Sequence, residues 1–258
     1  MLDLLKFDGA PVVITGAASG IGLSCCELFT DLGAKIVAVD SDPTFGLSQH
    51  GTALGLDWPE RYYSIDVSQE SEVRQLAKEV FSDFGEIASL VNIAGVGSTS
   101  SLEKMDLAHW NRIMQTNVTS MFLMVREFLP MMRENTGSVV NMSSTYAFAS
   151  RSNKAAYSAS KGAIVSLTKA AAIEASRKGI RVNAVCPGPV MTPRRVDAGA
   201  DGVDDLEKAA RRTLQGRMAL PGEIANLIAF LASRAASYIT GSAVIIDGGQ
   251  LSHIGEVT

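Results

Sequence analysis

The sequence predicts an α/β protein, in which a seven-stranded parallel β-sheet carries helices on both faces. Short runs rich in β-branched residues alternate with longer segments of helical periodicity, which is the pattern of repeated β–α–β units. Several of the short runs are apolar throughout, as strands buried on both faces are. The 258 residues contain no linker, repeat or break in composition, so we expect one domain over residues 1–258.

The predicted strands each contain valine or isoleucine, and the predicted helices repeat apolar residues at helical spacing. In chain order, the strands are Val12–Ile14, Lys35–Val39, Arg61–Ile65, Ala88–Ile93, Ser138–Met142, Ile180–Val185 and Ala243–Ile246. The helices are Gly20–Leu32, Glu70–Phe84, Leu107–Met132, Ala155–Ser176 and Leu220–Ala232. Two segments, Ser41–Glu60 and Pro187–Met218, follow neither pattern. Long irregular segments in α/β proteins usually border the ligand site, at the carboxyl ends of the strands.

The composition argues against several classes of function. The 23 Lys and Arg against 27 Asp and Glu give a net charge of −4, which argues against a nucleic-acid binder or a polybasic membrane patch. Residues 9–26 are uncharged, but glycines and a proline interrupt them. The three cysteines and three histidines are too few and scattered for a disulfide framework or metal cluster. We expect a cytoplasmic protein with no metal and no nucleic-acid or membrane partner.

A glycine-rich loop, TGAASGIG at Thr15–Gly22, joins the first strand to the first helix. Glycines here allow a tight turn and let backbone N–H groups approach a pyrophosphate, which then faces the positive end of the helix. The context predicts a Rossmann-type, doubly wound dinucleotide-binding fold. The residues expected to contact the cofactor in this loop are Gly16, Ser19, Gly20, Ile21 and Gly22.

Asp40 closes the second predicted strand, 18 residues after Gly22. A carboxylate there accepts hydrogen bonds from the adenosine ribose hydroxyls and repels a 2′-phosphate. Asp42 adds to that repulsion, and no Arg or Lys stands at positions 17–19 or 41. The alternative is that Asp40 only caps the next turn. With the glycine loop upstream, we expect NAD rather than NADP as the cofactor.

Further motifs follow in order along the chain: Asn92-Ile93-Ala94-Gly95, Asn117, Ser144, Tyr157-Ser158-Ala159-Ser160-Lys161, Pro187-Gly188 and Asp247-Gly248-Gly249. Together with the glycine loop, they resemble the short-chain dehydrogenase/reductase family over essentially the whole chain. The Tyr-x-x-x-Lys pair, with a serine 13 residues earlier, is specific when joined to that loop. One departure is Ile93, where the family usually has a second asparagine that mostly stabilises the central strand.

Tyr157 and Lys161 lie four positions apart, so one helix face presents both. A free tyrosine has a pKa of about 10, and a nearby ammonium lowers it. Tyr157 is therefore the candidate acid/base, and the Ser144 hydroxyl can hold the substrate oxygen beside it. The resemblance implies that Lys161 also binds the nicotinamide ribose. It further implies that Asn117 bends its helix and holds a water that relays protons to Lys161.

The resemblance also implies contacts along the rest of the cofactor. Near the adenine it places Asp66 and Val67, with the carboxylate accepting from the adenine amino group. Near the adenosine ribose it places Asn92, Ala94 and Gly95. Near the nicotinamide it places Pro187, Gly188, Val190 and Thr192.

These observations predict an NAD-dependent enzyme that interconverts a secondary alcohol and a ketone by hydride transfer. A 3-ketoacyl reductase is one alternative, although it would normally use NADPH, against which Asp40 argues. A catalytically silent NAD-binding regulator is another. Loss of Ser144, Tyr157 or Lys161 would have supported that alternative, and all three are present.

We expect a substrate lid at about 191–218, where an arginine could clamp a carboxylate or phosphate. The candidates are Arg194, Arg195, Arg211, Arg212 and Arg217. Nearby acidic residues favour an exposed charged face instead. Arg151, Asn153 and Tyr146 flank the catalytic stretch and could also line the pocket.

The helix Leu107–Met132 is rich in methionine and aromatic residues. A helix apolar around so much of its surface needs a second partner besides the sheet. The family commonly forms tetramers through this helix and the Tyr157 helix. We expect a homotetramer, with a dimer as the alternative.

Overall fold

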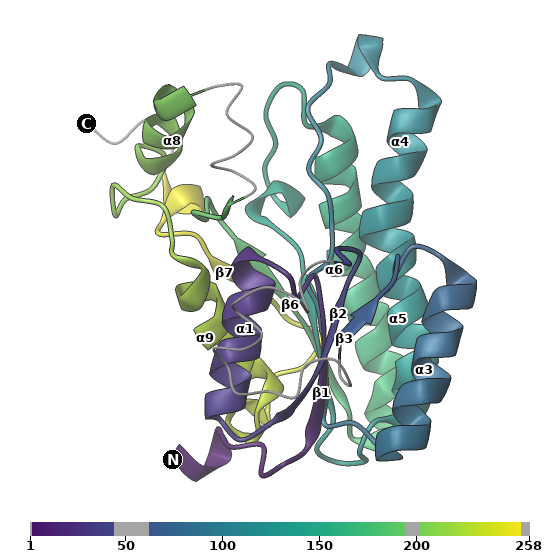
Figure 1. Cartoon of the computed structure of the whole chain (residues 1–258). Helices are drawn as coiled ribbons and strands as arrows, with labels where there is room; N and C mark the ends of the chain where they lie inside the picture. The colour runs from purple at the N-terminus through teal and green to yellow at the C-terminus, as the bar shows by residue number, and fades with distance from the viewer. Residues whose placement is uncertain (1, 44–61, 194–201, 254–258) are drawn as a thin grey trace.

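The computed structural model describes residues 2–43, 62–193 and 202–253, and it confirms the predicted fold class (Figure 1). Seven parallel strands form one sheet in the order β3-β2-β1-β4-β5-β6-β7. They are β1 (Pro11–Thr15), β2 (Lys35–Asp40), β3 (Tyr62–Ser64), β4 (Ser89–Asn92), β5 (Ser138–Met142), β6 (Arg181–Pro187) and β7 (Ala243–Ile246). The strand order reverses between β1 and β4, and such a switch point is where doubly wound sheets bind ligands.

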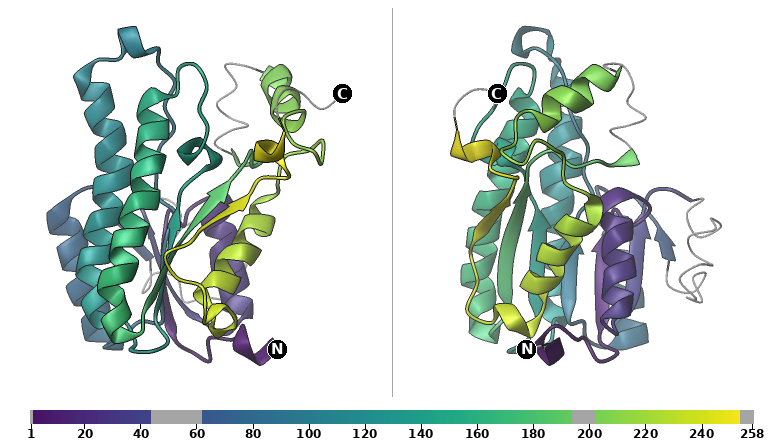
Figure 2. Two further views of the ribbon diagram at one scale, coloured as in Figure 1. Left: turned by 180° about the vertical axis from the view of Figure 1, so that it is seen from behind. Right: turned by 90° about the vertical axis from the view of Figure 1, so that its left-hand side faces the viewer.

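Helices cover both faces of the sheet, as Figures 1 and 2 show. One face carries α1 (Gly20–Asp31) and α9 (Pro221–Ala232). The other carries α3 (Glu70–Phe84), α5 (Ser120–Phe128) and α6 (Ala155–Ala175), with α4 (Leu107–Met114) continuing α5 beyond the sheet. The short α8 (Gly202–Ala210) lies at the end of the molecule opposite the N-terminus.

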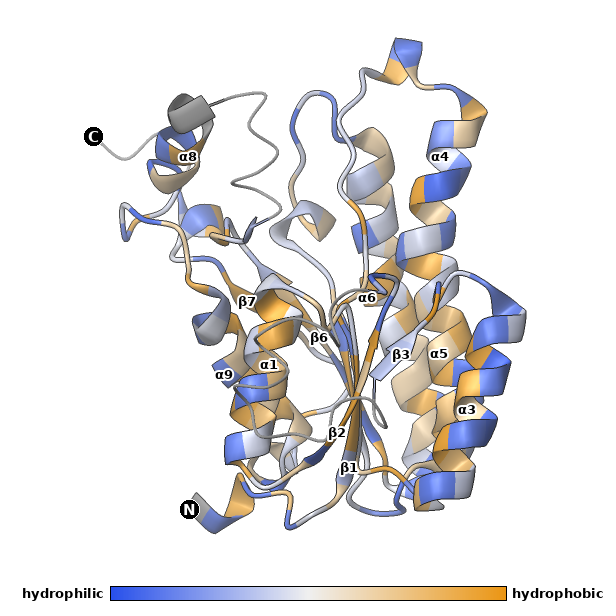
Figure 3. Cartoon of the chain, viewed as in Figure 1, coloured by the Kyte–Doolittle hydropathy of each residue, from blue (hydrophilic) through white to orange (hydrophobic). Residues whose placement is uncertain are grey.

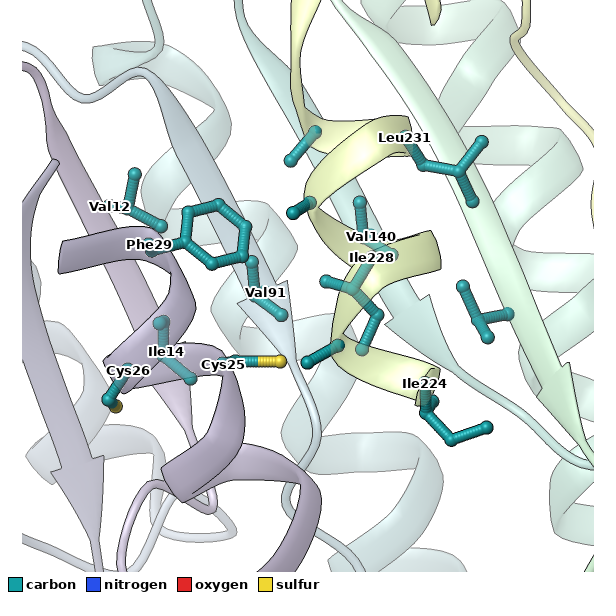
Figure 4. Packing of buried hydrophobic residues seen from close by; sticks show 14 of the residues in the cluster. Val12, Ile14, Cys25, Cys26, Phe29, Val91, Val140, Ile224, Ile228 and Leu231 are labelled. Carbon is teal, nitrogen blue, oxygen red and sulfur yellow. The ribbon is translucent and has the colours of Figure 1, made fainter. Parts of the chain in front are cut away.

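The layer between the sheet and the helices α1 and α9 is a closed apolar core (Figure 4). Phe29 of α1 and Ile228 of α9 are fully buried against Val12 and Ile14 of β1 and their neighbours. Each such side chain contributes roughly 1.5–3 kcal/mol by burial. The strands that supply this core are mostly hydrophobic in Figure 3. This core packs against the strands whose carboxyl ends present the site.

The cysteines are packing residues. Cys25 and Cys26 of α1 and Cys186 of β6 are all buried and free. Burial raises the pKa of each thiol above its ordinary value. Neutral thiols of this kind are small apolar fillers rather than nucleophiles.

Several methionine and aromatic residues of 107–132 pack inside the chain, some of them in a second apolar core on the face of the sheet that α3, α5 and α6 cover. Met121, Met124 and Phe128 are buried, the last two with Leu76 and Val80 of α3. Phe122 remains 44% exposed and lies beneath the Arg126 guanidinium. Packing within the chain thus accounts for some of these methionine and aromatic side chains, and the homotetramer stays a prediction.

Two expected elements differ in the structure. The helical stretch Leu107–Met132 is interrupted by a π-helical turn at Gln115–Thr119, and it ends in a 3₁₀ turn that contains Pro130. The segment Pro187–Met218, expected to be irregular, contains the helix α8, in which Ala209 is fully buried. Much of Ser41–Glu60, and residues 194–201 of the predicted lid, lie outside the described residues.

Candidate active site

A cavity of ≈ 680 Å³ lies at the carboxyl ends of the central strands, at the switch point. Most of the predicted site residues line it: Gly16, Ser19, Gly20, Ile21, Asp40, Asp66, Val67, Ala94, Gly95, Ser144, Tyr157, Lys161, Pro187, Gly188, Val190 and Thr192. Three do not: Gly22, Asn92 and Asn117. Residues as far apart in sequence as Gly16 and Thr192 therefore share one hollow.

The glycine loop needs its glycines for close packing. Gly16 has a φ of +70°, and a Cβ there would lie 2.9 Å from the Ala94 backbone nitrogen. A Cβ on Gly22 would lie 1.9 Å from the Gly16 carbonyl oxygen. Gly22 therefore allows the loop to pack closely against the first turn of α1 on the side away from the cavity. The start of α1, at Gly20 and Ile21, lines the cavity.

Thr15 fastens the end of β1 to the segment after β4. Its hydroxyl oxygen accepts from the backbone N–H groups of Ile93 and Ala94, at 3.0 and 3.1 Å. Ile93, the departure from the family pattern, is half-buried against the apolar core. The two central strand ends are thus joined without the second asparagine.

Asp40 fits both interpretations of its role. Its Oδ1 accepts from the Asp42 N–H at 3.2 Å, which caps the turn after β2, and its Oδ2 accepts from the Ala18 N–H at 2.9 Å. The same side chain lines the cavity. A carboxylate has about four lone-pair sites, so acceptors remain for ribose hydroxyls.

Asp66 and Asn92 are engaged mainly in local structure. The Asp66 carboxylate accepts from the Ser68 backbone N–H and the Gln69 amide. Burial raises the pKa of Asp66, but these hydrogen bonds outweigh it and the pKa is lowered. The Asn92 amide is buried and donates to Asn141 of β5 at 3.0 Å, so Asn92 holds β4 to β5 beneath the cavity.

The three central catalytic candidates come together. Tyr157 and Lys161 project from α6, and the Lys161 Nζ lies 5.6 Å from the centroid of the Tyr157 ring. That Nζ donates to the Met142 carbonyl at 2.9 Å. Burial lowers the pKa of Lys161 to about 8, against the opposing effect of Cys186. Ser144 follows β5, where its Oγ accepts from the Tyr146 N–H at 3.3 Å.

Asn117 lies in the π-helical turn that interrupts its helix. Its Oδ1 accepts from the Val96 N–H at 2.7 Å, and its Nδ2 donates to the Val96 carbonyl and to the Ser160 hydroxyl, both at 3.0 Å. The side chain therefore joins the segment after β4 to α6. The water relay implied by the resemblance stays a prediction.

A second cavity of ≈ 220 Å³ adjoins the first. The two share Gly97, Ser144, Tyr157 and Gly188. The remaining lining residues are Ser98, Thr145, Tyr146, Arg151, Lys154, Pro189, Arg212 and Gln250. Of the pocket candidates predicted beside the catalytic stretch, Tyr146 and Arg151 line it and Asn153 does not. Six residues of this lining are not among those expected from the sequence: Gly97, Ser98, Thr145, Lys154, Pro189 and Gln250. Only the rule that ligands bind beyond the carboxyl ends of strands pointed to the segments after β4 and β7.

The larger cavity fits a dinucleotide. Its volume lies within the roughly 300–1,000 Å³ common for ligand sites, and a glycine loop, a helix N-terminus and a strand-end carboxylate line it. Within residues 2–43, 62–193 and 202–253, no group of three His, Cys, Asp or Glu is placed to hold a metal ion. Over the same residues, no helix is long and apolar enough to cross a membrane.

A doubly wound sheet with this loop, and with a serine, tyrosine and lysine gathered in one cavity, defines an oxidoreductase that uses a nicotinamide cofactor. Comparison with known proteins agrees. A family model described as enoyl-(acyl carrier protein) reductase matches residues 16–250. The chain belongs to the short-chain dehydrogenase/reductase family.

The relatives span several activities. Dehydrogenase/reductase SDR family member 6 of Aquarana catesbeiana is 35% identical over 249 residues, which cover 95% of this chain and 98% of that protein. The 3-oxoacyl-[acyl-carrier-protein] reductase FabG of Thermotoga maritima is 33% identical, over 95% of this chain and 99% of its own. The ligand-free aldohexose dehydrogenase of Thermoplasma acidophilum superposes with a TM-score of 0.87, at 30% identity and over 98% of both chains. Their names differ in substrate, so the family leaves the substrate open.

Proposed function

We propose that this protein is an NAD(H)-dependent oxidoreductase that interconverts a secondary alcohol and a ketone, with Tyr157 as the acid/base. The observation that carries the proposal is the position of Tyr157 and Ser144, which line both cavities. A cofactor in the larger cavity and a small substrate in the other would meet beside these two side chains.

The bound nicotinamide would supply the hydride acceptor or donor. The protein's own residues handle the proton and the oxygen. In oxidation the Tyr157 phenolate takes the hydroxyl proton of the alcohol. In reduction the Tyr157 phenol gives its proton to the oxygen of the ketone. The Lys161 ammonium, 5.6 Å from the Tyr157 ring, favours the phenolate. The Ser144 hydroxyl donates to the substrate oxygen and fixes its position.

The charges of the larger cavity favour NAD over NADP. Asp40 and Asp66 both line it, and among its described lining residues the cation is Lys161. Lys161 bonds to the end of β5, which β1 and β4 separate from β2 in the sheet. A 2′-phosphate near Asp40 would therefore meet a carboxylate without an offsetting cation from these residues.

The test is turnover of an alcohol panel, followed by NADH absorbance, with wild type and Tyr157→Phe. General acid–base catalysis contributes about 10²–10⁴-fold, so the variant should lose that factor in kcat and keep its affinity for NADH. Tyr238→Phe is the matched control, because it removes the hydroxyl of a fully exposed tyrosine that lines neither cavity. Near-normal turnover of Tyr157→Phe would refute the assigned role.

Two alternatives have their own readouts in this assay. The FabG relative favours a 3-ketoacyl reductase, which would reduce a 3-ketoacyl thioester with NADPH faster than it turns over any alcohol. A silent regulator would bind NAD and turn over neither class of substrate.

A further inference from the structure

The smaller cavity is lined mainly by side chains that form hydrogen bonds. Of the twelve described residues in its wall, nine have a polar side chain, and the other three are two glycines and Pro189. Tyr157 and Ser144 belong to this wall, so a substrate that reacts there lies among polar groups. An alkyl chain would remove water from these groups and give no hydrogen bonds in return, which costs free energy. The described lining therefore favours a substrate that carries oxygens beyond the reacting one.

Tyr146 lies where it can bind such an oxygen. Its ring packs edge-on against Tyr157, with the ring centroids 5.5 Å apart, and its backbone N–H donates to the Ser144 Oγ at 3.3 Å. The Tyr146 side chain is half-buried and lines the cavity. Its hydroxyl forms no hydrogen bond with residues 2–43, 62–193 or 202–253, and it remains accessible. A phenol beside both catalytic candidates can donate to, or accept from, a substrate hydroxyl near the reacting carbon.

Two further neutral side chains reach the same cavity from other strand ends. Gln250 follows β7, and its Oε1 accepts from the Thr145 hydroxyl at 3.3 Å. The Gln250 Nε2 is accessible and has no hydrogen bond with the part of the chain that the structure describes. Ser98 follows β4, and its Oγ lies 2.9 Å from the His109 Nε2. With Tyr146, which follows β5, three neutral hydrogen-bonding groups converge on one hollow of ≈ 220 Å³.

The arginines of the predicted lid do not decide the class of substrate. Arg211 faces Glu207 at 3.7 Å, Arg217 forms two contacts of 2.7 Å with Glu223, and neither arginine lines the cavity. Arg212 does line it, but guanidinium N–H groups donate to hydroxyl oxygens as well as to anions. A hydroxy acid is therefore the comparison that an experiment on the substrate has to include.

We propose that Tyr146, Gln250 and Ser98 bind further hydroxyl groups of the substrate, so that the protein acts on a polyol or a sugar, or on the ketone derived from it. The inference rests on the proposed function, because it places the reacting carbon at Tyr157 and the other hydroxyls at these three side chains. One neutral hydrogen bond is worth about 2- to 10-fold in affinity. Several of them together distinguish a polyol from a mono-alcohol with the same carbon skeleton.

The experiment compares alcohols that share a carbon skeleton and differ in the number of hydroxyl groups. One series is the four-carbon secondary alcohol, its vicinal diol and the tetrol, and the other is cyclohexanol, its vicinal diol and the fully hydroxylated ring. The four-carbon hydroxy acid is the charged comparison. In at least one series, we expect kcat/KM to rise by about 2- to 10-fold for each added hydrogen bond and to exceed that of the acid. No rise in either series, or the acid as the best substrate, would overturn the inference.

Two variants test the assigned residues. Tyr146→Phe keeps the ring against Tyr157 and removes the hydroxyl, and Gln250→Met keeps the length of the side chain and removes the amide. Each should lower the ratio of kcat/KM for the polyol to that for the mono-alcohol by about 2- to 10-fold, mainly through KM. Tyr238→Phe, at an exposed position outside both cavities, is the matched control and should leave the ratio unchanged. Equal loss for the polyol and the mono-alcohol would overturn the assignment of that side chain.

A binding measurement separates this inference from the proposed function. In calorimetric titration of the NADH-loaded protein with the polyols, no alcohol can be oxidised, and we expect binding that Tyr146→Phe weakens. Such binding without turnover of any alcohol would refute the proposed function and retain the hydroxyl-binding site. Turnover of alcohols that does not depend on the added hydroxyls, with no polyol binding, would refute the site and retain the function.

Discussion

Replacing Lys161 by methionine should change how the stability of the cofactor-free protein depends on pH. Methionine keeps the apolar stem and removes the amine. The Lys161 side chain is 4% exposed, and burial lowers its pKa from 10.5 to about 8. The folded protein therefore binds the lysine proton more weakly than the unfolded chain does.

The size and sign of the effect follow from this difference in proton binding. A difference of about 2.5 pH units corresponds to roughly 3 kcal/mol. Below pH 8 both states carry the charge, so the wild type bears the whole penalty. As the pH rises from about 8 to 10.5, the folded state releases its proton first and the penalty disappears. The free energy of unfolding of the wild type, minus that of Lys161→Met, should rise by about 3 kcal/mol over this interval.

Urea unfolding followed by circular dichroism, at half-unit steps from pH 7 to 10.5, measures this difference. Titration of Cys25 and Cys26 occurs in both proteins and cancels. Because Lys161 and Cys186 influence each other's pKa, both proteins carry Cys186→Ala in this experiment. Lys169→Met, an exposed position on the same helix, is the matched control. A difference between wild type and Lys161→Met that stays constant over the whole interval would show that the Lys161 amine is not held in a desolvated position.

Two further predictions concern Asp40 and Arg181. The wild type should prefer NAD to NADP by at least about tenfold in kcat/KM. The reason is repulsion between the Asp40 carboxylate and the 2′-phosphate of NADP: two like unit charges at 4 Å cost roughly 4 kcal/mol at an effective dielectric of about 20, before salt reduces it. Asp40→Asn should shrink the ratio, and equal use of both cofactors by the wild type would contradict the role of Asp40. The buried Arg181 guanidinium donates to the Leu231 and Ser233 carbonyls at the end of α9, at 2.7 and 2.8 Å. Arg181→Met should lower the free energy of unfolding by about 2–4 kcal/mol in urea, whereas the exposed Arg177→Met should leave it nearly unchanged.

The fold could be predicted because its determinants are local. Each buried strand is a short apolar run, and the glycine loop falls between the first strand and helix, where its packing requires it. The turn at Gln115–Thr119 has no such signature, because its polar residues, Gln115, Thr116, Asn117 and Thr119, would equally suit the surface of a regular helix. The helix α8 was missed because its apolar residues, Val203, Leu206, Ala209 and Ala210, form a short pattern among charged neighbours. The burial of Ala209 depends on tertiary contacts.

The site shows the same division between local and tertiary information. Tyr157 and Lys161 share a helix, so their spacing alone predicts that they lie together. Arg211 and Arg212 are neighbours of identical chemistry, and the sequence cannot tell which faces a glutamate and which lines a cavity. Asp66 is a similar case, since the partners of its carboxylate are set by the turn that begins α3.

The amide of Asn117 has a mechanical consequence. It binds both backbone groups of Val96, as a neighbouring strand would, and it also binds Ser160, whose hydroxyl donates to the Tyr157 carbonyl. Gly97, next to Val96, belongs to the wall between the two cavities. One amide therefore ties the segment after β4 to the backbone of the helix that carries the tyrosine. Hydrogen bonds of this kind within a site lower the free energy needed to order it when a ligand binds.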